Sequence, residues 1–150
     1  MWYRNIIITI LLTFPTVALG EIIPHCALIK QAKKFGALDP KLVLAVVQVE
    51  STGNSKAMNE DQYGLMQIKL STARMLGFDK HPKELLQWKT NLKLGIKYLN
   101  EKLRKYKIVQ AAAAAYNAGK VYIKWARFVN QDYVDLVMFH YKKYKNLKCS

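Results

Sequence analysis

The spacing of hydrophobic residues predicts a succession of short helices. After residue 90, apolar residues recur every three or four positions, as on one face of an amphipathic helix: Leu92, Ile96, Leu99, Leu103 and Tyr106. Asp39 and Pro40 suit a helix N-cap and first helical position, so a second helix should run from Lys41 to about Ser51. Because this segment is apolar on most faces, we expect it at the centre of a domain.

The remaining helices are indicated by capping residues or runs of helix formers. They are expected from Pro24 to Gly36, from Ser71 to Gly77, from Pro82 onward, over alanines 111–115 to Gly119, around Trp125, and from Val134 to Tyr144. Turn-forming residues dominate positions 52–69, which predicts a loop with a short hairpin there. The pattern therefore predicts one mainly α-helical domain with a small loop-rich insert.

The first twenty residues have the composition of a cleavable secretory signal. Arg4 supplies a positive charge, an apolar stretch follows, and small residues stand just before Glu21. The apolar stretch is shorter than the ~20 residues that span a membrane, although a retained anchor is the alternative. We expect residues 1–20 to be removed, leaving a domain of residues 21–150 that is periplasmic or secreted and not stably inserted in a membrane.

Charge narrows the partners without identifying one. The formal net charge of +14 favours an anionic polymer, and teichoic acid, phospholipid and the carboxylate-bearing peptides of a cell wall all fit. Export makes nucleic acid the least favoured partner. Basic clusters at 102–107 and 142–148 either attract such carboxylates or are solvated helix faces. The histidines are scattered and no Cys/His cluster has metal-ligand spacing, so we expect neither a metal nor a cofactor.

Two cysteines lie near the ends of the exported part. Cys26 and Cys149 would join those ends if they form a disulfide in an oxidising compartment. The alternatives are two free thiols or a bond to a partner protein. We favour the intramolecular disulfide.

One acidic residue has surroundings that suit acid catalysis. Glu50 follows the apolar run Val46–Val49 at the end of the expected central helix. Apolar surroundings and the negative end of a helix dipole both raise the pKa of a carboxyl group. A carboxylic acid that stays protonated near neutral pH is what glycosidic bond cleavage requires of its general acid. The plainer alternative is a glutamate that extends from the helix end into water.

Several short motifs follow one another along the chain. They are Glu50-Ser51, Gly64 to Ile68, the helix pattern Asn91, Gly95 and Tyr98-Leu99, Ala115 to Gly119, and Tyr133-Val134. Each is weak alone, but their order and separations make the chain resemble the soluble lytic transglycosylase family over roughly residues 24–144. The resemblance implies a lysozyme-like single domain of the goose-type or SLT class, with a small loop or β-hairpin insert beside an active-site groove.

The resemblance also implies roles for the matching residues. Glu50 matches the single catalytic acid/base, and Ser51 matches a serine that holds substrate or orders the site. Tyr133 matches a tyrosine whose hydroxyl orients the catalytic carboxylate. Contact with the glycan is implied for Gly64, Met66, Gln67, Tyr116 and Asn117.

Each implied role has a structural alternative. Leu65 and Met66 are also typical of a hydrophobic core. Tyr116 could pack against the alanine-rich helix while Asn117 only caps it. Tyr133 could be one of nine tyrosines with no special role.

The implied activity is cleavage between N-acetylmuramic acid and N-acetylglucosamine in peptidoglycan, with formation of 1,6-anhydro-muramyl ends. A lysozyme-like hydrolase is the nearest alternative, and it would use a second carboxylate, for which Glu60 and Asp61 are the only acids in the expected groove loop. Small exported members of the family resemble factors that accompany secretion or conjugation machines. A weakly catalytic glycan-binding component of such a machine is therefore another alternative, as is a cationic membrane-disrupting protein.

Overall fold

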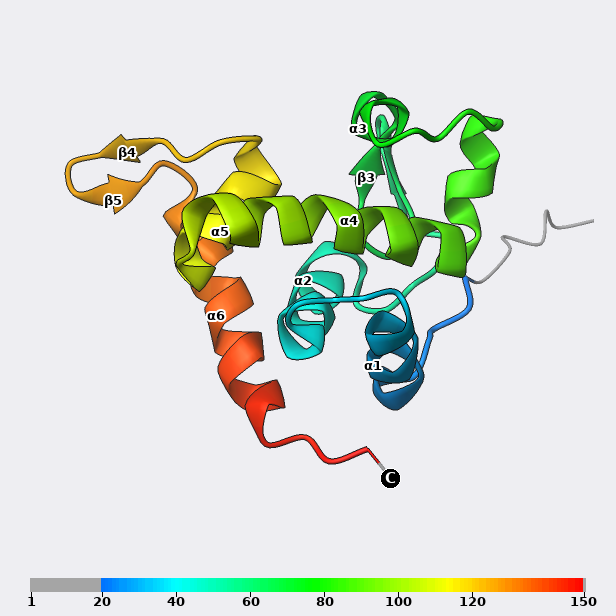
Figure 1. Cartoon of the computed structure of the whole chain (residues 1–150), viewed down its shortest axis with the longest axis horizontal. Helices are drawn as coiled ribbons and strands as arrows, with labels where there is room; N and C mark the ends of the chain where they lie inside the picture. Colours follow the sequence, from blue (N-terminus) through cyan, green and yellow to red (C-terminus); the bar gives the residue numbers. More distant parts are fainter. Residues whose placement is uncertain (1–19, 150) are drawn as a thin grey trace, which may run out of the picture.

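One buried helix lies at the centre of the computed structural model, which describes residues 20–149 (Figure 1). This helix is α2 (Pro40–Ser51), and its residues 42–47 are all buried. Asp39 caps it, because its Oδ1 accepts hydrogen bonds from the backbone N–H groups of Lys41 and Leu42, each at 3.0 Å. The prediction of a central apolar helix with this cap is confirmed. Most of the predicted signal peptide, residues 1–19, lies outside the described residues.

Four of the other helices surround α2 (Figure 1). They are α1 (His25–Lys34), α4 (Trp88–Tyr106), α5 (Val109–Ala118) and α6 (Gln131–Lys145). Helices α1 and α6 pack directly on α2, and α5 packs on both α4 and α6. The buried alanines 112–115 permit this close approach of α5, and Gly119 ends the helix as expected, with φ 81°. No helix within residues 20–149 has the length and apolar character of a bilayer-spanning segment.

The loop-rich insert forms one wing of the molecule. It contains a three-stranded antiparallel sheet of β1 (Met58–Asn59), β2 (Gln62–Tyr63) and β3 (Ile68–Lys69). The short α3 (Leu70–Met75) and a 3₁₀ helix, η1 (Pro82–Leu86), follow it. The insert beside the central helix was predicted, although with one hairpin rather than three strands.

A fully buried asparagine fastens this wing to α4. The Oδ1 of Asn91 accepts a hydrogen bond from the backbone N–H of Met66 at 2.8 Å. Its Nδ2 donates to the carbonyl oxygens of Tyr63 and Leu85 at 2.6 and 2.9 Å. Gly64 lies directly against it, since a Cβ at that position would come within 2.6 Å of the Asn91 amide nitrogen. A side chain at position 64 would therefore displace the group that holds the wing in place.

The predicted helix around Trp125 is wrong. The chain there forms an antiparallel hairpin of β4 (Ile123–Lys124) and β5 (Arg127–Phe128). Its two turn residues, Trp125 and Ala126, have φ values of 54° and 60°, which an α-helix does not contain. The expected cap at Ser71 is also wrong, because α3 begins at Leu70 with Lys69 as its N-cap.

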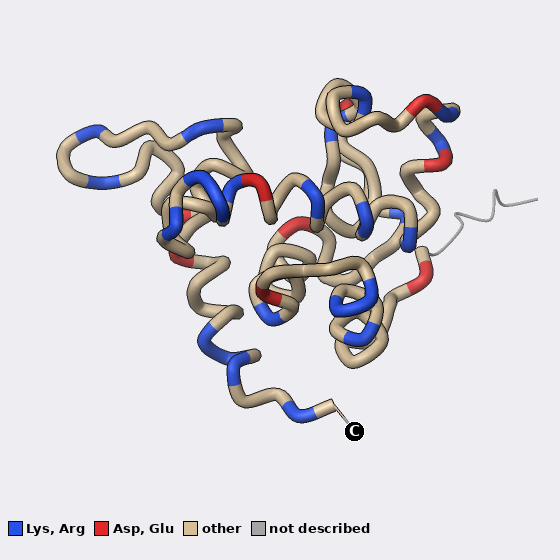
Figure 2. Tube along the Cα trace, viewed as in Figure 1, with Lys and Arg blue, Asp and Glu red and all other residues tan. Residues whose placement is uncertain are grey.

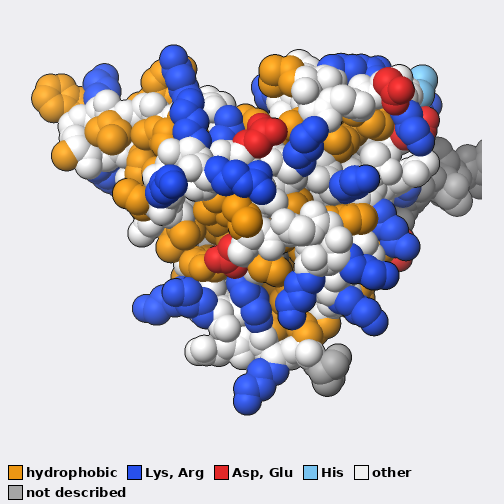
Figure 3. Space-filling view, in the orientation of Figure 1, with side chains coloured by type: hydrophobic (Ala, Val, Ile, Leu, Met, Phe, Trp, Pro, Cys, Tyr) orange, Lys and Arg blue, Asp and Glu red, His pale blue; other side chains and the backbone are white. Residues whose placement is uncertain are grey.

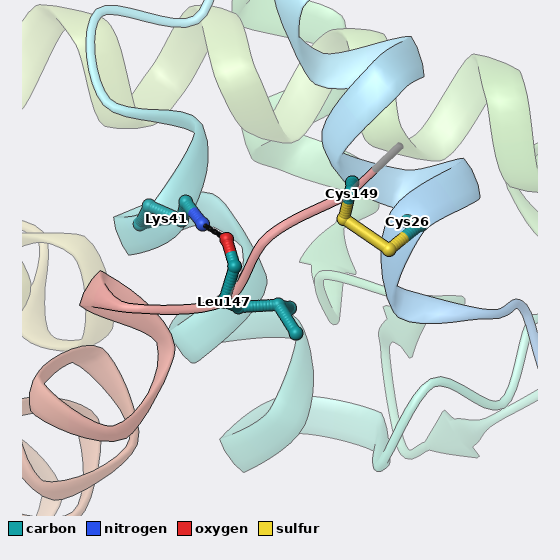
Figure 4. Close-up of a disulfide and its surroundings, with 4 residues drawn as sticks. All are labelled: Cys26, Lys41, Leu147 and Cys149. Atoms are coloured by element: carbon teal, nitrogen blue, oxygen red, sulfur yellow. Dashed lines mark hydrogen bonds between the residues drawn. A yellow bond between two sulfur atoms is a disulfide. The ribbon is translucent and has the colours of Figure 1, made fainter.

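The predicted disulfide is present. Cys26 of α1 and Cys149 of the C-terminal tail are bonded, with 5.4 Å between their Cα atoms (Figure 4). The Lys41 ammonium also donates a hydrogen bond to the carbonyl oxygen of Leu147 in the same tail. The tail that follows α6 is thus fastened to both α1 and α2.

Loss of the disulfide should destabilise the fold. The bond joins residues 123 positions apart, and a crosslink over so long a loop typically stabilises a small exported domain by about 2–5 kcal/mol. The Cys26→Ser/Cys149→Ser variant should lose free energy of unfolding of this size in a urea titration. Reductant should lower the stability of the unmodified protein equally and leave the variant unchanged. Equal stability of the two proteins without reductant would contradict this expectation.

Candidate active site

Glu50 lies in the last turn of α2 and is half-buried. Burial in apolar surroundings disfavours its ionised form and raises the pKa of the Glu50 carboxyl from 4.5 to about 7. A hydrogen bond from Tyr133 acts in the opposite direction, because it stabilises the carboxylate. The raised pKa that the sequence indicated is therefore present, with burial as its main cause.

Tyr133 holds the Glu50 carboxyl from the first turn of α6. Its hydroxyl donates a hydrogen bond to Oε1 of Glu50 at 2.7 Å. Burial and the negative charge of Glu50 hold the pKa of Tyr133 well above 10, so its hydroxyl keeps the donated proton. This is the contact that the family resemblance implied, made between residues 83 positions apart in the chain.

A cavity of about 260 Å³ lies between the insert and the end of α5. Of the residues expected to touch substrate, three line it: Gln67, Tyr116 and Asn117. The rest of its lining is mostly polar or small: Gln62, Ile68, Lys69, Thr72, Tyr98, Ala118 and Gly119. It offers amide, hydroxyl and ammonium groups beside two aromatic rings, which suits a polar ligand with flat apolar faces, such as a sugar.

Tyr116 connects this cavity with Glu50, which is not part of the lining. Its ring lies 5.2 Å from that of Tyr98, and its hydroxyl donates to the Met66 carbonyl oxygen at 2.8 Å. Burial and then the charge of Glu50 hold the pKa of Tyr116 well above 10. Tyr116 therefore lines the cavity and also lies close enough to Glu50 for the charge of the carboxylate to raise the Tyr116 pKa.

Three residues expected to touch substrate are buried instead. The Ser51 hydroxyl donates to the Leu65 carbonyl oxygen at 2.8 Å and accepts from the Gly53 N–H at 3.2 Å. Met66 packs against Gly95, where a Cβ would come within 2.2 Å of the sulfur. Gly64 packs against Asn91, as described above. These residues fix the wall of the site from behind, and direct contact with a sugar stays a prediction for them.

Two contributors carried little signal in the sequence. Asn130 donates to the Asn117 Oδ1 at 2.9 Å and to the Ala114 carbonyl oxygen at 3.0 Å, which links the start of α6 to the end of α5. The sequence indicates Tyr98 only as part of a helix pattern, yet this residue lines the cavity. An amphipathic pattern could have placed Tyr98 on an inner face, but no local pattern distinguishes Asn130 from any other asparagine in a turn.

The pKa of Glu50 is set by burial and by Tyr133, and no other carboxylate among the described residues shifts it. None of the described residues that line the 260 Å³ cavity is acidic. Asp61, one of the two acids expected near the groove, is exposed and lies 3.7 Å from the Lys69 ammonium; Glu60 is exposed as well. Glu50 is also the one carboxylate whose charge acts on Tyr116 and Tyr133.

A larger cavity does not coincide with this chemistry. Its volume is about 670 Å³, and its walls come from the end of α1, the segment after α3 and one side of α4. It contains neither Glu50 nor Tyr133 nor any residue of the 260 Å³ cavity. We therefore locate the site by its titrating group and not by volume.

The comparisons with known proteins agree with this architecture, which is that of a lysozyme-like domain. The family model of the transglycosylase SLT domain matches residues 27–132. The chain belongs to the transglycosylase SLT domain family.

Two solved structures are similar to it. One is an inactive mutant of the lytic transglycosylase Slt from Pseudomonas aeruginosa, with a TM-score of 0.53 and 24% identity over 79% of this chain and 22% of that protein. The other is the 70 kDa soluble lytic transglycosylase of Escherichia coli, with a TM-score of 0.53 and 24% identity over 77% of this chain and 18% of that protein. The chain thus spans about a fifth of each of these longer proteins, and the likeness shows a shared fold.

The raised pKa of Glu50 makes a prediction about stability. Because the folded state binds this proton more tightly than the unfolded state, the free energy of unfolding should fall as pH rises from 4.5 to about 7. Glu50→Gln removes this cost, so the variant should be more stable than the unmodified protein by about 1–3 kcal/mol at pH 8. The difference should shrink towards pH 4.5. Urea titrations at both pH values measure it.

Glu101→Gln is the matched control, because this glutamate is exposed on α4. Its stability should follow that of the unmodified protein at both pH values. If Glu50→Gln has no greater stability at pH 8, the carboxyl is not buried as described.

Proposed function

We propose that this protein is a peptidoglycan lytic transglycosylase and that Glu50 is its catalytic acid and base. The observation that carries the proposal is a half-buried carboxyl with a pKa of about 7, held by Tyr133 near a groove whose described lining contains no carboxylate. Membership of the SLT domain family supports it. The names of the two structural neighbours, both lytic transglycosylases, point the same way.

In the first step Glu50 acts as an acid. Its carboxyl proton passes to the glycosidic oxygen between N-acetylmuramic acid and N-acetylglucosamine, and the bond from C1 of the muramyl residue to that oxygen breaks. Positive charge develops at C1, and the N-acetyl group of the same sugar stabilises it, because none of the described residues that line the groove is a carboxylate. The hydrogen bond from Tyr133 then stabilises the ionised Glu50.

In the second step Glu50 acts as a base. The carboxylate removes the proton from the C6 hydroxyl of the muramyl residue, and the C6 oxygen bonds to C1. The products are a 1,6-anhydro-muramyl end and a new N-acetylglucosamine end, and Glu50 is protonated again. Water is not consumed, which distinguishes this reaction from that of a hydrolase.

The groove residues would position the glycan for both steps. The side chains of Asn117 and Lys69 can hydrogen-bond sugar hydroxyl and acetamido groups, and Tyr98 and Tyr116 offer aromatic surface. The Gln67 amide nitrogen is already bound to the carbonyl oxygens of Ala57 and Gly64, so its Oε1 is the atom available to a ligand. Such positioning supplies much of the rate, since acid–base catalysis alone is worth about 10² to 10⁴.

The proposed substrate requires export, which the composition of residues 1–20 supports. We propose that cleavage before Glu21 releases the domain to the periplasm or the medium. The intact mass of the exported protein tests this, since it should equal that of residues 21–150 with one disulfide. A mass that includes residues 1–20 would contradict it. Association with a secretion or conjugation machine stays a prediction from the family resemblance.

Product chemistry tests the proposed reaction. Mass spectrometry of fragments released from purified peptidoglycan should find anhydro-muramyl ends with the unmodified protein. Glu50→Gln should reduce release by at least about 10²-fold, because it removes the transferable proton. Tyr133→Phe should release fragments more slowly. It should also shift the alkaline limb of the pH–rate profile to higher pH, because the hydrogen bond that lowers the Glu50 pKa is lost.

Glu60→Gln is the control, since this acid is exposed on the same insert; its release should match that of the unmodified protein. Reducing muramyl ends in place of anhydro ends would establish a hydrolase. Equal release by Glu50→Gln would show that another group is the acid.

A further inference from the structure

The β4–β5 hairpin projects from the body of the protein (Figure 1). Its strand register places Trp125 in the turn at the tip. The Trp125 side chain is 87% exposed, the highest value among the large hydrophobic side chains of the described residues. The hairpin lies at the opposite side of the molecule from α3 and the insert (Figure 1). Catalysis as proposed above uses no residue of this hairpin.

The hairpin contains two locally unfavourable features. Trp125 and Ala126 both adopt left-handed backbone conformations, with φ values of 54° and 60°. Asn-Gly is the usual pair for such a turn, because residues with a Cβ adopt this conformation at a cost. Lys124 and Arg127 are directly paired across the strands, and like charges in such a pair repel each other. Departures from local preference of this kind concentrate where a segment has a function.

Further apolar side chains surround the tip. Tyr122, Ile123 and Val129 of the hairpin region are exposed. On neighbouring α6, which contacts β5, Leu136 and Phe139 are exposed as well. Figure 3 shows hydrophobic side chains along this edge of the molecule, from the hairpin tip towards α6. Single exposed apolar residues are ordinary, but a group of this size on one edge indicates a contact surface.

The charges on the hairpin are all positive. Lys120, Lys124 and Arg127 lie within residues 119–131, a segment with no acidic residue (Figure 2). The nearest acids are Asp132 and Asp135 in the first turns of α6, and Asp135 accepts a hydrogen bond from the Gln131 amide at 2.9 Å. The surface that meets the hairpin tip should therefore be negatively charged and apolar beneath.

We propose that this hairpin is a membrane-docking element, which places Trp125 in the interfacial layer of a bilayer that contains anionic lipids. Tryptophan and tyrosine favour the depth of the lipid headgroups, and lysine and arginine bind the negative surface above it. Aliphatic side chains such as Ile123 and Val129 suit acyl chains better than sugar hydroxyls. This docking is peripheral and leaves the domain outside the bilayer. It does not depend on the proposed catalytic activity.

Hydrogen bonds at the base of the hairpin connect it to the groove, so docking of the hairpin would also orient the groove relative to the membrane. The Phe128 N–H donates to the Gln131 Oε1 at 3.2 Å, and the adjacent Asn130 donates to Asn117, which lines the 260 Å³ cavity. A docked hairpin would therefore hold the groove at a fixed height and angle above the lipid surface. That arrangement would favour glycan strands close to the membrane.

Co-sedimentation with lipid vesicles tests the proposal. The protein should bind vesicles of phosphatidylglycerol and phosphatidylcholine, and its tryptophan emission should shift to shorter wavelength as Trp125 leaves water. Vesicles of phosphatidylcholine alone should bind it much more weakly, and added salt should reduce binding to the anionic vesicles. Trp125→Ala should lower the partition coefficient about tenfold or more and abolish the emission shift.

Two further variants separate charge from apolar contact. Lys124→Gln/Arg127→Gln should weaken binding to anionic vesicles by roughly 25-fold, since each cation near such a surface is worth about fivefold. Met75→Ala is the matched control, because Met75 is a large exposed apolar residue on α3, away from the hairpin. It should bind like the unmodified protein. Circular dichroism of each variant verifies that its fold is retained.

Two outcomes would overturn the proposal. The unmodified protein could fail to bind anionic vesicles, or Trp125→Ala could bind them equally well. In the first case, binding of the unmodified protein to purified sacculi should be measured as well, and Trp125→Ala could lose it. Sacculus binding of that kind would assign the hairpin to the glycan. A depression of about 360 Å³ runs along the hairpin, and Trp125, Arg127 and Asp132 are among the residues that line it.

Discussion

The placement of one carboxyl group at the end of a buried helix constrains most of this fold. Glu50 follows the fully buried part of α2, and ionising it there is costly, as its pKa of about 7 indicates. The hydroxyl of Tyr133 offsets part of that cost, which requires the first turn of α6 to lie against the last turn of α2. The close packing of α6 on α2 and the disulfide after α6 both maintain this arrangement. Features far from the groove are thus connected to the chemistry of Glu50.

The second wall of the site depends on a different kind of constraint. The insert has only two-residue strands and could not hold its shape by its own sheet. Asn91 replaces that missing stability with three hydrogen bonds from a rigid helix, and the Tyr116 hydroxyl adds a fourth by binding the Met66 carbonyl oxygen. Gly64 and Gly95 are required because the insert approaches α4 too closely for a Cβ. Packing therefore accounts for both glycines, whereas the family resemblance had implied contact with a sugar for Gly64.

The difference between what the sequence predicted and what it did not follows from the range of the interactions. The cap at Asp39, the apolar α2 and the end of α5 at Gly119 depend on neighbouring residues, and they were predicted correctly. The apolar context of Glu50 is also local and made it a candidate, and the family resemblance then implied its catalytic role. The Tyr133 contact was reached only through the family resemblance, since it spans 83 positions. The hairpin at Trp125 and the bond from Asn130 to Asn117 depend on where α5 and α6 meet, and no pattern within one segment contains that information.

In the proposed reaction, the same carboxyl group must give up a proton and then take one back. A strongly acidic group would be ionised before it could protonate the glycosidic oxygen, and a very weakly acidic one would release its proton too slowly. General acid–base catalysis is most efficient when the pKa of the group lies near the working pH, so a value of about 7 suits both steps. Burial alone would raise the pKa further, and the hydrogen bond from Tyr133 opposes it. Tyr133 can do so because its own pKa is held well above 10, which keeps it a donor throughout the cycle. The two residues therefore act together. Burial keeps Glu50 protonated for the first step, and the hydrogen bond from Tyr133 stabilises the carboxylate that forms when the proton leaves.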